Sequence, residues 1–436
     1  MLSRRSRIAK LCSGRSRVRW QAIPMPDSPA PMISTSTCRV IEVLVSSGSR
    51  TRAPLSERCR EVTCYRKLRL DRGVPDATFA TELKRVAVRR GGRRSGGPMR
   101  VYTAIYGLTD SAERARALRA AGVAGVFTFE GPHDVFAPLT LAATVGGLDL
   151  LTNVAIAFPR NPIHLAHQAN DLQLLSGGRF ALGLGTQIRT QIERRFGATF
   201  DDPVERMAEL VAALRAIFDC WQTGERLDFR GRYYRHTLMT PTFSPGPNPF
   251  GPPPIHLGAL GPRMTAMAAR VADGLLVMPF TSRRYLRERT MPAVDEGLAA
   301  AGRERADFTV VPEVIVAVGR SAAEQAAADA ATRRLLAFYG STPAYRPVLD
   351  LHGWGELQPE LNALSKQGRW QEMAHLVDDD MLATIAARGT PAEVAADIRA
   401  RVSGLSDRVC FYQPYAPDDA TLVELVDHLV GADQAV

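Results

Sequence analysis

The chain has 436 residues, of which 45% are apolar and 23% charged, proportions that are ordinary for a globular protein. Its net charge of +10 would suggest a nucleic-acid partner. However, residues 1–98 carry 22 Lys and Arg against 7 Asp and Glu, whereas the remaining residues carry 33 against 38. We therefore expect no nucleic-acid partner for residues 99–436, and the lack of a long apolar run argues against a membrane-spanning segment.

Residues 1–98 also differ from the rest in composition. They are rich in Arg and Ser, keep no helical or strand period, and hold few large apolar side chains, so burial would not offset the entropy cost of folding. We expect a disordered basic extension, or one outside the native protein with translation starting at Met99. A targeting sequence and a nucleic-acid-binding arm are the alternatives. Only two cysteines, Cys220 and Cys410, lie beyond this segment, so no disulfide framework is predicted and a cytoplasmic location is expected.

From Arg100 onward, short apolar stretches alternate with amphipathic ones. The apolar stretches have the composition of parallel strands that are buried on both faces. Eight strands are predicted, at 101–106, 125–130, 150–157, 180–185, 255–260, 274–279, 308–318 and 408–413.

The amphipathic stretches between the strands carry helix start signals. Asp110, Asp202 and Thr390 each stand three residues before a glutamate, the pattern of a helix N-cap, and the last two are followed by proline. Alternating strands and helices form a parallel sheet, and eight units predict a (β/α)8 barrel over residues 99–436. Residues 222–253 and 340–380, after the fourth and seventh strands, are predicted to be loop insertions that cover the active face.

The functional groups of such a barrel lie at the carboxyl ends of its strands. Glu130, His133 and Asp134 follow the second strand. Two carboxylates and an imidazole can transfer protons near neutral pH, which makes Glu130 and His133 the catalytic candidates. The alternatives are structural, with Asp134 as a helix cap and Glu130 in a salt bridge.

Two glycine-containing stretches end the fourth strand and follow the fifth. SGGRFALGLGTQ, residues 176–187, lacks the third glycine of G-x-G-x-x-G and the lysine of a P-loop. It is therefore predicted to be a strand in which Gly183 and Gly185 leave room for a flat ligand. GALGPR, residues 258–263, enters a helix whose first backbone amides, together with Arg263, are suited to an anion. An ordinary turn and cap is the alternative.

Together these stretches resemble the bacterial luciferase-like monooxygenase superfamily. The resemblance is closest to its branch of oxidoreductases that use the 8-hydroxy-5-deazaflavin coenzyme F420. The matching blocks are LSGGRFALGLGTQ, GALGPRMTAMAARVADGLLVMPF and LTNVAIAF, with further similarity over residues 191–241 and 337–355. The resemblance implies a (β/α)8 barrel with the coenzyme ring over its carboxyl-end mouth.

The resemblance also implies which residues bind the coenzyme. A non-proline cis peptide bond of the family would join Asn153 to Val154, and Gly185, Thr186 and Gln187 would line the ring. The contacts to the coenzyme phosphate would fall on Gly258, Ala259, Gly261, Pro262 and Arg263. Many deazaflavin-dependent members place His or Asp-His directly after the second strand. This chain has Glu130-Gly131 there instead, so Glu130 is expected to bind or polarise and His133 to shuttle a proton.

The primary hypothesis is that the protein transfers hydride between reduced coenzyme F420 and an unidentified small organic substrate. The alternatives are an FMN-dependent monooxygenase served by a separate flavin reductase, and a coenzyme-binding protein without turnover. No metal is predicted, because His164, His167 and Asp171 lack a zinc signature. Relatives are commonly dimers, so a homodimer is the candidate assembly. The aromatic residues of the insertions suggest a planar or apolar substrate, or else lid packing: Tyr233, Tyr234, Phe338, Tyr339 and Trp354.

Overall fold

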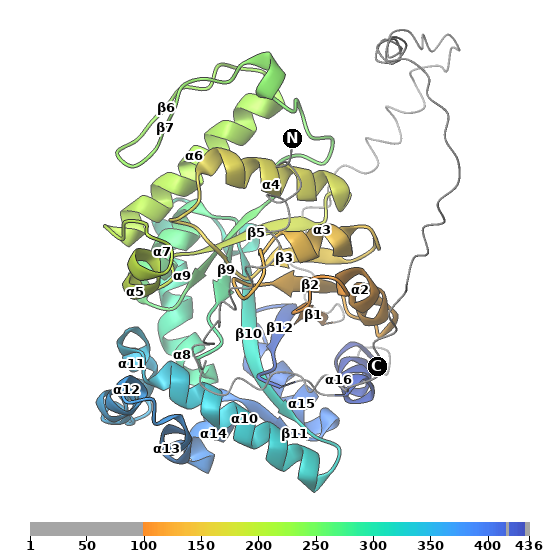
Figure 1. The fold of residues 1–436 in the computed structure, drawn as a ribbon, viewed down its shortest axis with the longest axis vertical. Helices are drawn as coiled ribbons and strands as arrows, with labels where there is room; N and C mark the ends of the chain where they lie inside the picture. Colours follow the sequence, from red (N-terminus) through yellow and green to blue (C-terminus); the bar gives the residue numbers. More distant parts are fainter. Residues whose placement is uncertain (1–98, 416–417, 432–436) are drawn as a thin grey trace, which may run out of the picture. The chain divides into compact units, whose positions relative to one another are not determined.

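The computed structural model describes residues 99–415 and 418–431, which form a closed barrel of parallel strands (Figure 1). Each strand pairs with the next, and β12 closes the ring by pairing with both β10 and β1. The predicted (β/α)8 fold is confirmed, while the predicted basic extension, residues 1–98, lies outside the described residues. The barrel strands are β1 (Arg100–Ala104), β2 (Gly125–Thr128), β3 (Asp149–Thr152), β5 (Phe180–Gly185), β8 (Ile255–Ala259), β9 (Gly274–Val277), β10 (Thr309–Val318) and β12 (Arg408–Tyr412).

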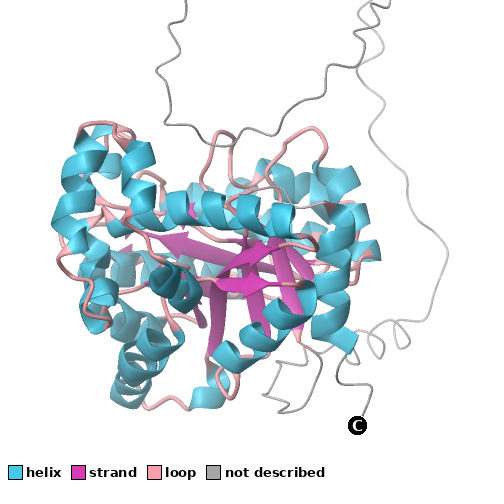
Figure 2. Cartoon of the chain, turned by 90° about the horizontal axis from the view of Figure 1, so that it is seen from below, coloured by secondary structure: helices cyan, strands magenta, loops and turns pink. Residues whose placement is uncertain are grey.

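Side chains from alternate strand positions fill the inside of the barrel, as the two-residue period of a strand requires. Tyr102, Phe127, Leu276, Val311 and Cys410 belong to this interior cluster, and all of them are buried. The residues between them face the surrounding helices, which enclose the strands in Figure 2. Because both faces of each strand are buried, the strands read as continuous apolar stretches in the sequence.

The third predicted strand, 150–157, is broken in the structure. It forms β3 and then a separate two-residue strand, β4 (Ala155–Ile156), which pairs with β5. The break falls at the cis peptide bond between Asn153 and Val154.

The outer helices are α2 (Ser111–Ala120), α3 (Ala137–Ala143), α4 (Pro162–Leu175), α5 (Arg189–Arg194), α6 (Pro203–Thr223), α7 (Pro262–Val271), α8 (Arg283–Tyr285), α9 (Met291–Ala300), α15 (Pro391–Val402) and α16 (Asp419–Gly431). The helices that follow the three start signals are α2, α6 and α15, and further helices complete the outer layer. Short turns of other helical types are η1 (Pro241–Phe243), η2 (Leu286–Thr290) and η3 (Arg305–Asp307). None of the helices in the described part of the chain is both long and apolar enough to cross a membrane.

The three predicted N-caps have different outcomes. Thr390 forms a complete capping box with Glu393. Asp110 and Asp202 precede their helices, but neither side chain accepts a hydrogen bond from the first turn. Asp202 has a left-handed backbone, and its carboxylate instead bonds the Tyr233 hydroxyl at 2.9 Å and lies 3.0 Å from Arg232.

The first insertion is a hairpin that runs back along α6 (Figure 1). Its strands are β6 (Phe229–Arg230) and β7 (Arg235–His236). The Glu209 carboxylate of α6 accepts backbone hydrogen bonds from residues 232–234 at 2.6–2.9 Å. The Tyr234 hydroxyl accepts a further bond from Arg206. These contacts fix the hairpin tip beside the first turns of α6.

The second insertion, predicted at residues 340–380, follows β10 as expected, and it is largely helical. Between α10 (Ala322–Gly340) and α14 (Asp379–Ile385) it contains η4 (Pro343–Tyr345), α11 (Arg346–Leu351), α12 (Leu357–Lys366) and α13 (Trp370–His375). The short strand β11 (Ala387–Gly389) then pairs with the last residues of β10. These helices share a hydrophobic cluster with Phe280 and Tyr285, which follow β9. The sequence showed no helical period in this insertion, because many of its apolar residues stand close to turn residues.

A substitution at Gly183 tests the closeness of β3 and β5. A Cβ atom there would lie 1.8 Å from the Thr152 carbonyl oxygen, whereas one at Gly431 would meet nothing within 4 Å. We expect Gly183→Ala to lower the free energy of unfolding by about 2 kcal/mol or more, and Gly431→Ala to leave it nearly unchanged. Denaturant unfolding of both variants measures this, and equal stabilities would contradict the packing described.

Candidate functional site

The cis peptide bond lies at the mouth of the barrel, between the predicted residues Asn153 and Val154. Just before it, the Thr152 hydroxyl accepts a hydrogen bond from the Gly183 amide and donates one to the Gly183 carbonyl, both at 2.8 Å. The Thr152 side chain thus replaces backbone pairing between β3 and β5 at the point where β3 ends. Val154 is partly buried and packs against the interior cluster of the barrel.

Val154 occupies the space that glycines leave in the neighbouring strands. A Cβ at Gly185 would lie 2.5 Å from one Val154 methyl group, and a Cβ at Gly258 would lie 3.1 Å from the other. The glycines of GLGT were predicted to leave room for a ligand. At Gly183 and Gly185 the room is instead filled by Thr152 and Val154, so the glycines shape the site by admitting the chain after β3.

Aromatic rings from several strand ends line the same mouth. Tyr106, after β1, contacts Phe129, after β2, edge to face at a ring separation of 5.6 Å. Phe129 lies 6.5 Å from Tyr412, at the end of β12. Tyr412 lies 6.3 Å from Tyr339 of α10, which in turn lies 5.9 Å from Phe280. The second insertion therefore contributes directly to the mouth, as predicted for Tyr339.

The other aromatic candidates lie elsewhere. Phe338 is half exposed and packs on Trp370. Trp354 stacks on His352 with a ring separation of 4.8 Å. Tyr233 and Tyr234 belong to the hairpin tip beside α6.

Glu313 of β10 is a buried carboxyl group at the mouth, and the sequence analysis missed it. It is two residues beyond Val311, which faces the barrel interior, and it pairs in register with Cys410. Only 7% of Glu313 is exposed. Its carboxyl group is hydrogen-bonded to Asn153, and burial raises its pKa to about 8. The signal that could have found it is a single glutamate among the ten residues of an otherwise uncharged strand. Buried acids without a partner are rare, so such a residue indicates a possible functional site.

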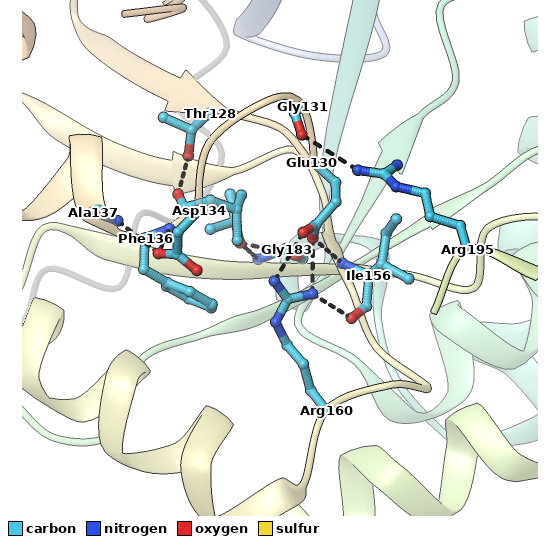
Figure 3. A network of polar contacts seen from close by, with 12 residues as sticks. Thr128, Glu130, Gly131, Asp134, Phe136, Ala137, Ile156, Arg160, Gly183 and Arg195 are labelled. Carbon is cyan, nitrogen blue, oxygen red and sulfur yellow. Dashed lines mark hydrogen bonds and ion pairs between the residues drawn. The ribbon is translucent and has the colours of Figure 1, made fainter. Parts of the chain in front are cut away.

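The carboxylate of Glu130 is held by hydrogen bonds from Arg160 and from a backbone amide (Figure 3). Arg160 bonds both of its oxygens, at 2.8 and 3.0 Å, and the Ile156 amide donates to it at 3.1 Å. Both side chains of the ion pair are mostly buried. The salt bridge that was weighed as the alternative is present, and it ties the end of β2 to the segment that follows β4.

His133 and Asp134 lie on the loop after β2 and are exposed. Asp134 accepts hydrogen bonds from the Phe136 and Ala137 amides, both at 2.9 Å, at the start of α3. Figure 3 shows these bonds on the opposite side of the loop from the Glu130 carboxylate. The structure thus gives Asp134 the capping role, and it leaves His133 exposed.

The predicted anion site surrounds the start of α7. Gly261 is the N-cap residue, Pro262 is the first helical residue, and a Cβ at Gly261 would meet nothing within 4 Å. The Arg263 side chain is 80% exposed and lies 3.5 Å from Glu205. The first amides of a helix have no partner within it, so this approach is open to an anion.

The fourth-strand end is less regular. Gln187 has a left-handed backbone with φ of 56°, and its side-chain oxygen accepts a hydrogen bond from the next amide. Thr186 is partly buried beside it.

The residues considered as metal ligands, His164, His167 and Asp171, are not grouped as a metal site in the structure. His167 packs its ring 4.6 Å from that of Trp221, and His164 is exposed. Within residues 99–415 and 418–431, no three His, Cys, Asp or Glu side chains are grouped so as to hold a metal.

Comparison with known proteins identifies the family. The pattern described as luciferase-like monooxygenase matches residues 89–408. The chain belongs to this family. An uncharacterized protein of Mycobacterium tuberculosis (strain H37Rv) is 50% identical over 303 residues, which cover 69% of this chain and 89% of that one. A putative coenzyme F420-dependent oxidoreductase of the same strain is 29% identical over 289 residues, 62% of this chain and 81% of that one.

A solved structure shows the same fold. The coenzyme F420-dependent tetrahydromethanopterin reductase from Methanopyrus kandleri superposes with a TM-score of 0.64 at 20% identity. The match covers 77% of this chain and 99% of that one. The likeness to this structure is one of fold. Membership of the luciferase-like monooxygenase family supports an enzyme of the oxidoreductase or monooxygenase kind, and one relative is named for coenzyme F420.

The mouth of this luciferase-like barrel fits a flat, partly polar ring. Val154 and the aromatic side chains provide apolar surface. At the same edge the buried side-chain amide nitrogen of Gln413 has no hydrogen-bond partner, although a buried polar group normally has one. A ring with carbonyl or ring-nitrogen acceptors would satisfy it.

Removing the charge of Glu130 tests its positioning role. Glu130→Gln breaks a mostly buried bidentate pair, whereas Glu193→Gln breaks an exposed pair with Arg189 of similar length. We expect a loss of roughly 2 kcal/mol of unfolding free energy for the first, between the values of exposed and buried pairs. The second should change stability by less than about 0.5 kcal/mol. Thermal unfolding of the two variants measures this difference. A Glu130→Gln variant as stable as the parent protein would contradict the positioning role of Glu130.

Proposed function

We propose that this luciferase-like protein is a coenzyme F420-dependent oxidoreductase that reduces or oxidises a small organic substrate by hydride transfer. The observation that carries the proposal is the placement of Val154. The chain after the cis peptide inserts this side chain between Gly185 and Gly258, at the mouth, and so forms a wall for a flat ring. The 29% identity to a putative F420-dependent oxidoreductase supports the deazaflavin over FMN.

The remaining predicted residues have complementary tasks in this proposal. The amides at Gly258–Gly261 and the Arg263 guanidinium would bind the coenzyme phosphate at the start of α7. Asn153, Gly185, Thr186 and Gln187 would border the ring. When bound and reduced, the deazaflavin supplies the hydride. The aromatic mouth would exclude water from the reacting atoms.

Glu130 and His133 keep separate roles. Glu130, held by Arg160, would fix the loop that follows β4, and His133 stands in solvent, from which it could bring protons to the rim. Homodimer formation and a cytoplasmic location stay predictions.

Cofactor titration tests the proposal. Purified protein is titrated with oxidised F420 and, separately, with FMN, and binding is followed by the fluorescence of each cofactor. We expect saturable F420 binding and much weaker FMN binding. Tight FMN binding with oxygen consumption would instead establish the monooxygenase alternative. F420 binding without turnover over a broad panel of carbonyl and imine substrates would favour the coenzyme-binding protein.

The phosphate role of Arg263 has its own test. Arg263→Ala should weaken F420 binding several-fold at low salt, by about 1 kcal/mol, because it removes a charge-assisted contact at the rim. The phosphate-free deazaflavin riboside should bind the variant and the parent protein equally. Arg116→Ala, another exposed arginine, is the control and should bind F420 normally. If Arg263→Ala weakened both ligands equally, the phosphate assignment would be wrong.

A further inference from the structure

Glu313 is a buried carboxyl group at the barrel mouth that forms no ion pair with any described residue. Acidic side chains elsewhere at the mouth are accounted for, since Glu130 pairs with Arg160 and Asp134 caps a helix. Glu313 forms no ion pair in residues 99–415 or 418–431. Such a group is costly to bury in charged form, so its presence calls for an explanation.

The groups that face Glu313 come from four elements. Asn153, beside the cis peptide bond, is hydrogen-bonded to its carboxyl group. The titratable neighbours are Tyr106 after β1, Cys410 and Tyr412 of β12, and Tyr339 of α10, and the charge of Glu313 acts on all of them. All of these neighbours are acids that are neutral near pH 7.

This arrangement favours the protonated carboxylic acid. Burial disfavours the carboxylate, and the four acidic neighbours offer no positive charge to compensate. The hydrogen bond from Asn153 opposes this effect only in part, since the pKa of Glu313 still rises to about 8. A carboxylic acid kept neutral in this way can donate a hydrogen bond or a proton.

We propose that Glu313 is the proton donor of the site, giving its proton to the substrate that binds beside the coenzyme ring at Val154. This inference rests on the proposed function, because it needs a reduced deazaflavin as the hydride source. Asn153 is then a positioning residue, which holds the Glu313 carboxyl group next to the wall that Val154 forms.

The step balances for reduction of a carbonyl or imine substrate. The hydride forms the new C–H bond, and the π electron pair moves to the oxygen or nitrogen. That atom takes the proton as the Glu313 O–H bond breaks, leaving a carboxylate bonded to Asn153. A bound, reduced deazaflavin would supply this hydride and give a further proton to solvent, a two-electron oxidation of the coenzyme. The Glu313 carboxylate then recovers its proton from solvent.

Infrared spectroscopy of the full chain tests whether Glu313 holds a proton. With 13C-labelled glutamate, a protonated carboxyl band should persist above pH 6 and disappear with a midpoint near the pKa of about 8. Glu313→Gln should lack the band, and Glu424→Gln, an exposed site on α16, should retain it. Absence of the band from the parent protein at pH 6–7 would overturn the proposal, and this result does not depend on the variant folding.

Binding of oxidised F420 tests whether that proton faces the ligand. The ring is anionic at neutral pH through its acidic 8-hydroxyl group, so it should bind the neutral acid better than the carboxylate. We expect Kd to rise about tenfold per pH unit above pH 8 in the parent protein and in Glu424→Gln, and to stay flat in Glu313→Gln. A Kd that is independent of pH in the parent protein would overturn the donor role. Failure of F420 to bind at any pH, with the infrared band present, would overturn the proposed function instead.

Discussion

The close approach of the third and fourth barrel strands at Gly183 determines the shape of the whole mouth. The Thr152 carbonyl lies where any side chain at position 183 would be, and the Thr152 hydroxyl bonds both backbone groups of Gly183. With β3 held this tightly, the chain turns inward at Asn153 and Val154 before it rejoins the sheet as β4. Gly185 and Gly258 are small because Val154 needs their space. One local packing constraint thereby places Val154 at the mouth, and it brings Asn153 to Glu313.

The second insertion and α10 before it add apolar side chains to the mouth. These helices bury Phe280 and Ile315 of the barrel in a shared cluster, so they are fixed to the barrel by apolar packing. Tyr339 then extends the row of aromatic rings from Tyr412 to Phe280. The same burial that stabilises the insertion removes water from around Glu313 and so favours its protonated form.

Much of the fold could be predicted from the sequence, because strands buried on both faces have a plain apolar signature. The capping box at Thr390 and the location of the cis peptide bond were also found in advance. The cis bond was predicted only through family resemblance, since no local property of Asn153 and Val154 indicates it. The role of Glu130 could be limited to two alternatives, and the ion pair with Arg160 that the structural one requires is present.

The parts that could not be predicted depend on contacts between residues far apart in the chain. Glu313 becomes significant only when β10 is placed beside β12, and Asn153 lies 160 residues earlier in the sequence. The role of Gly185 likewise depends on a side chain from another strand. Periodicity indicates which residues are buried, but it does not indicate which buried neighbours meet.

A crystal structure of the protein with oxidised F420 tests the central claim most directly. The account predicts that the deazaflavin ring lies against Val154 within the aromatic mouth and that the phosphate lies at the start of α7. A separate cavity of about 430 Å³, lined by Arg283, Arg284 and Arg287, offers positive charge for an anionic ligand. Coenzyme bound in that cavity, with the mouth left to solvent, would contradict the account.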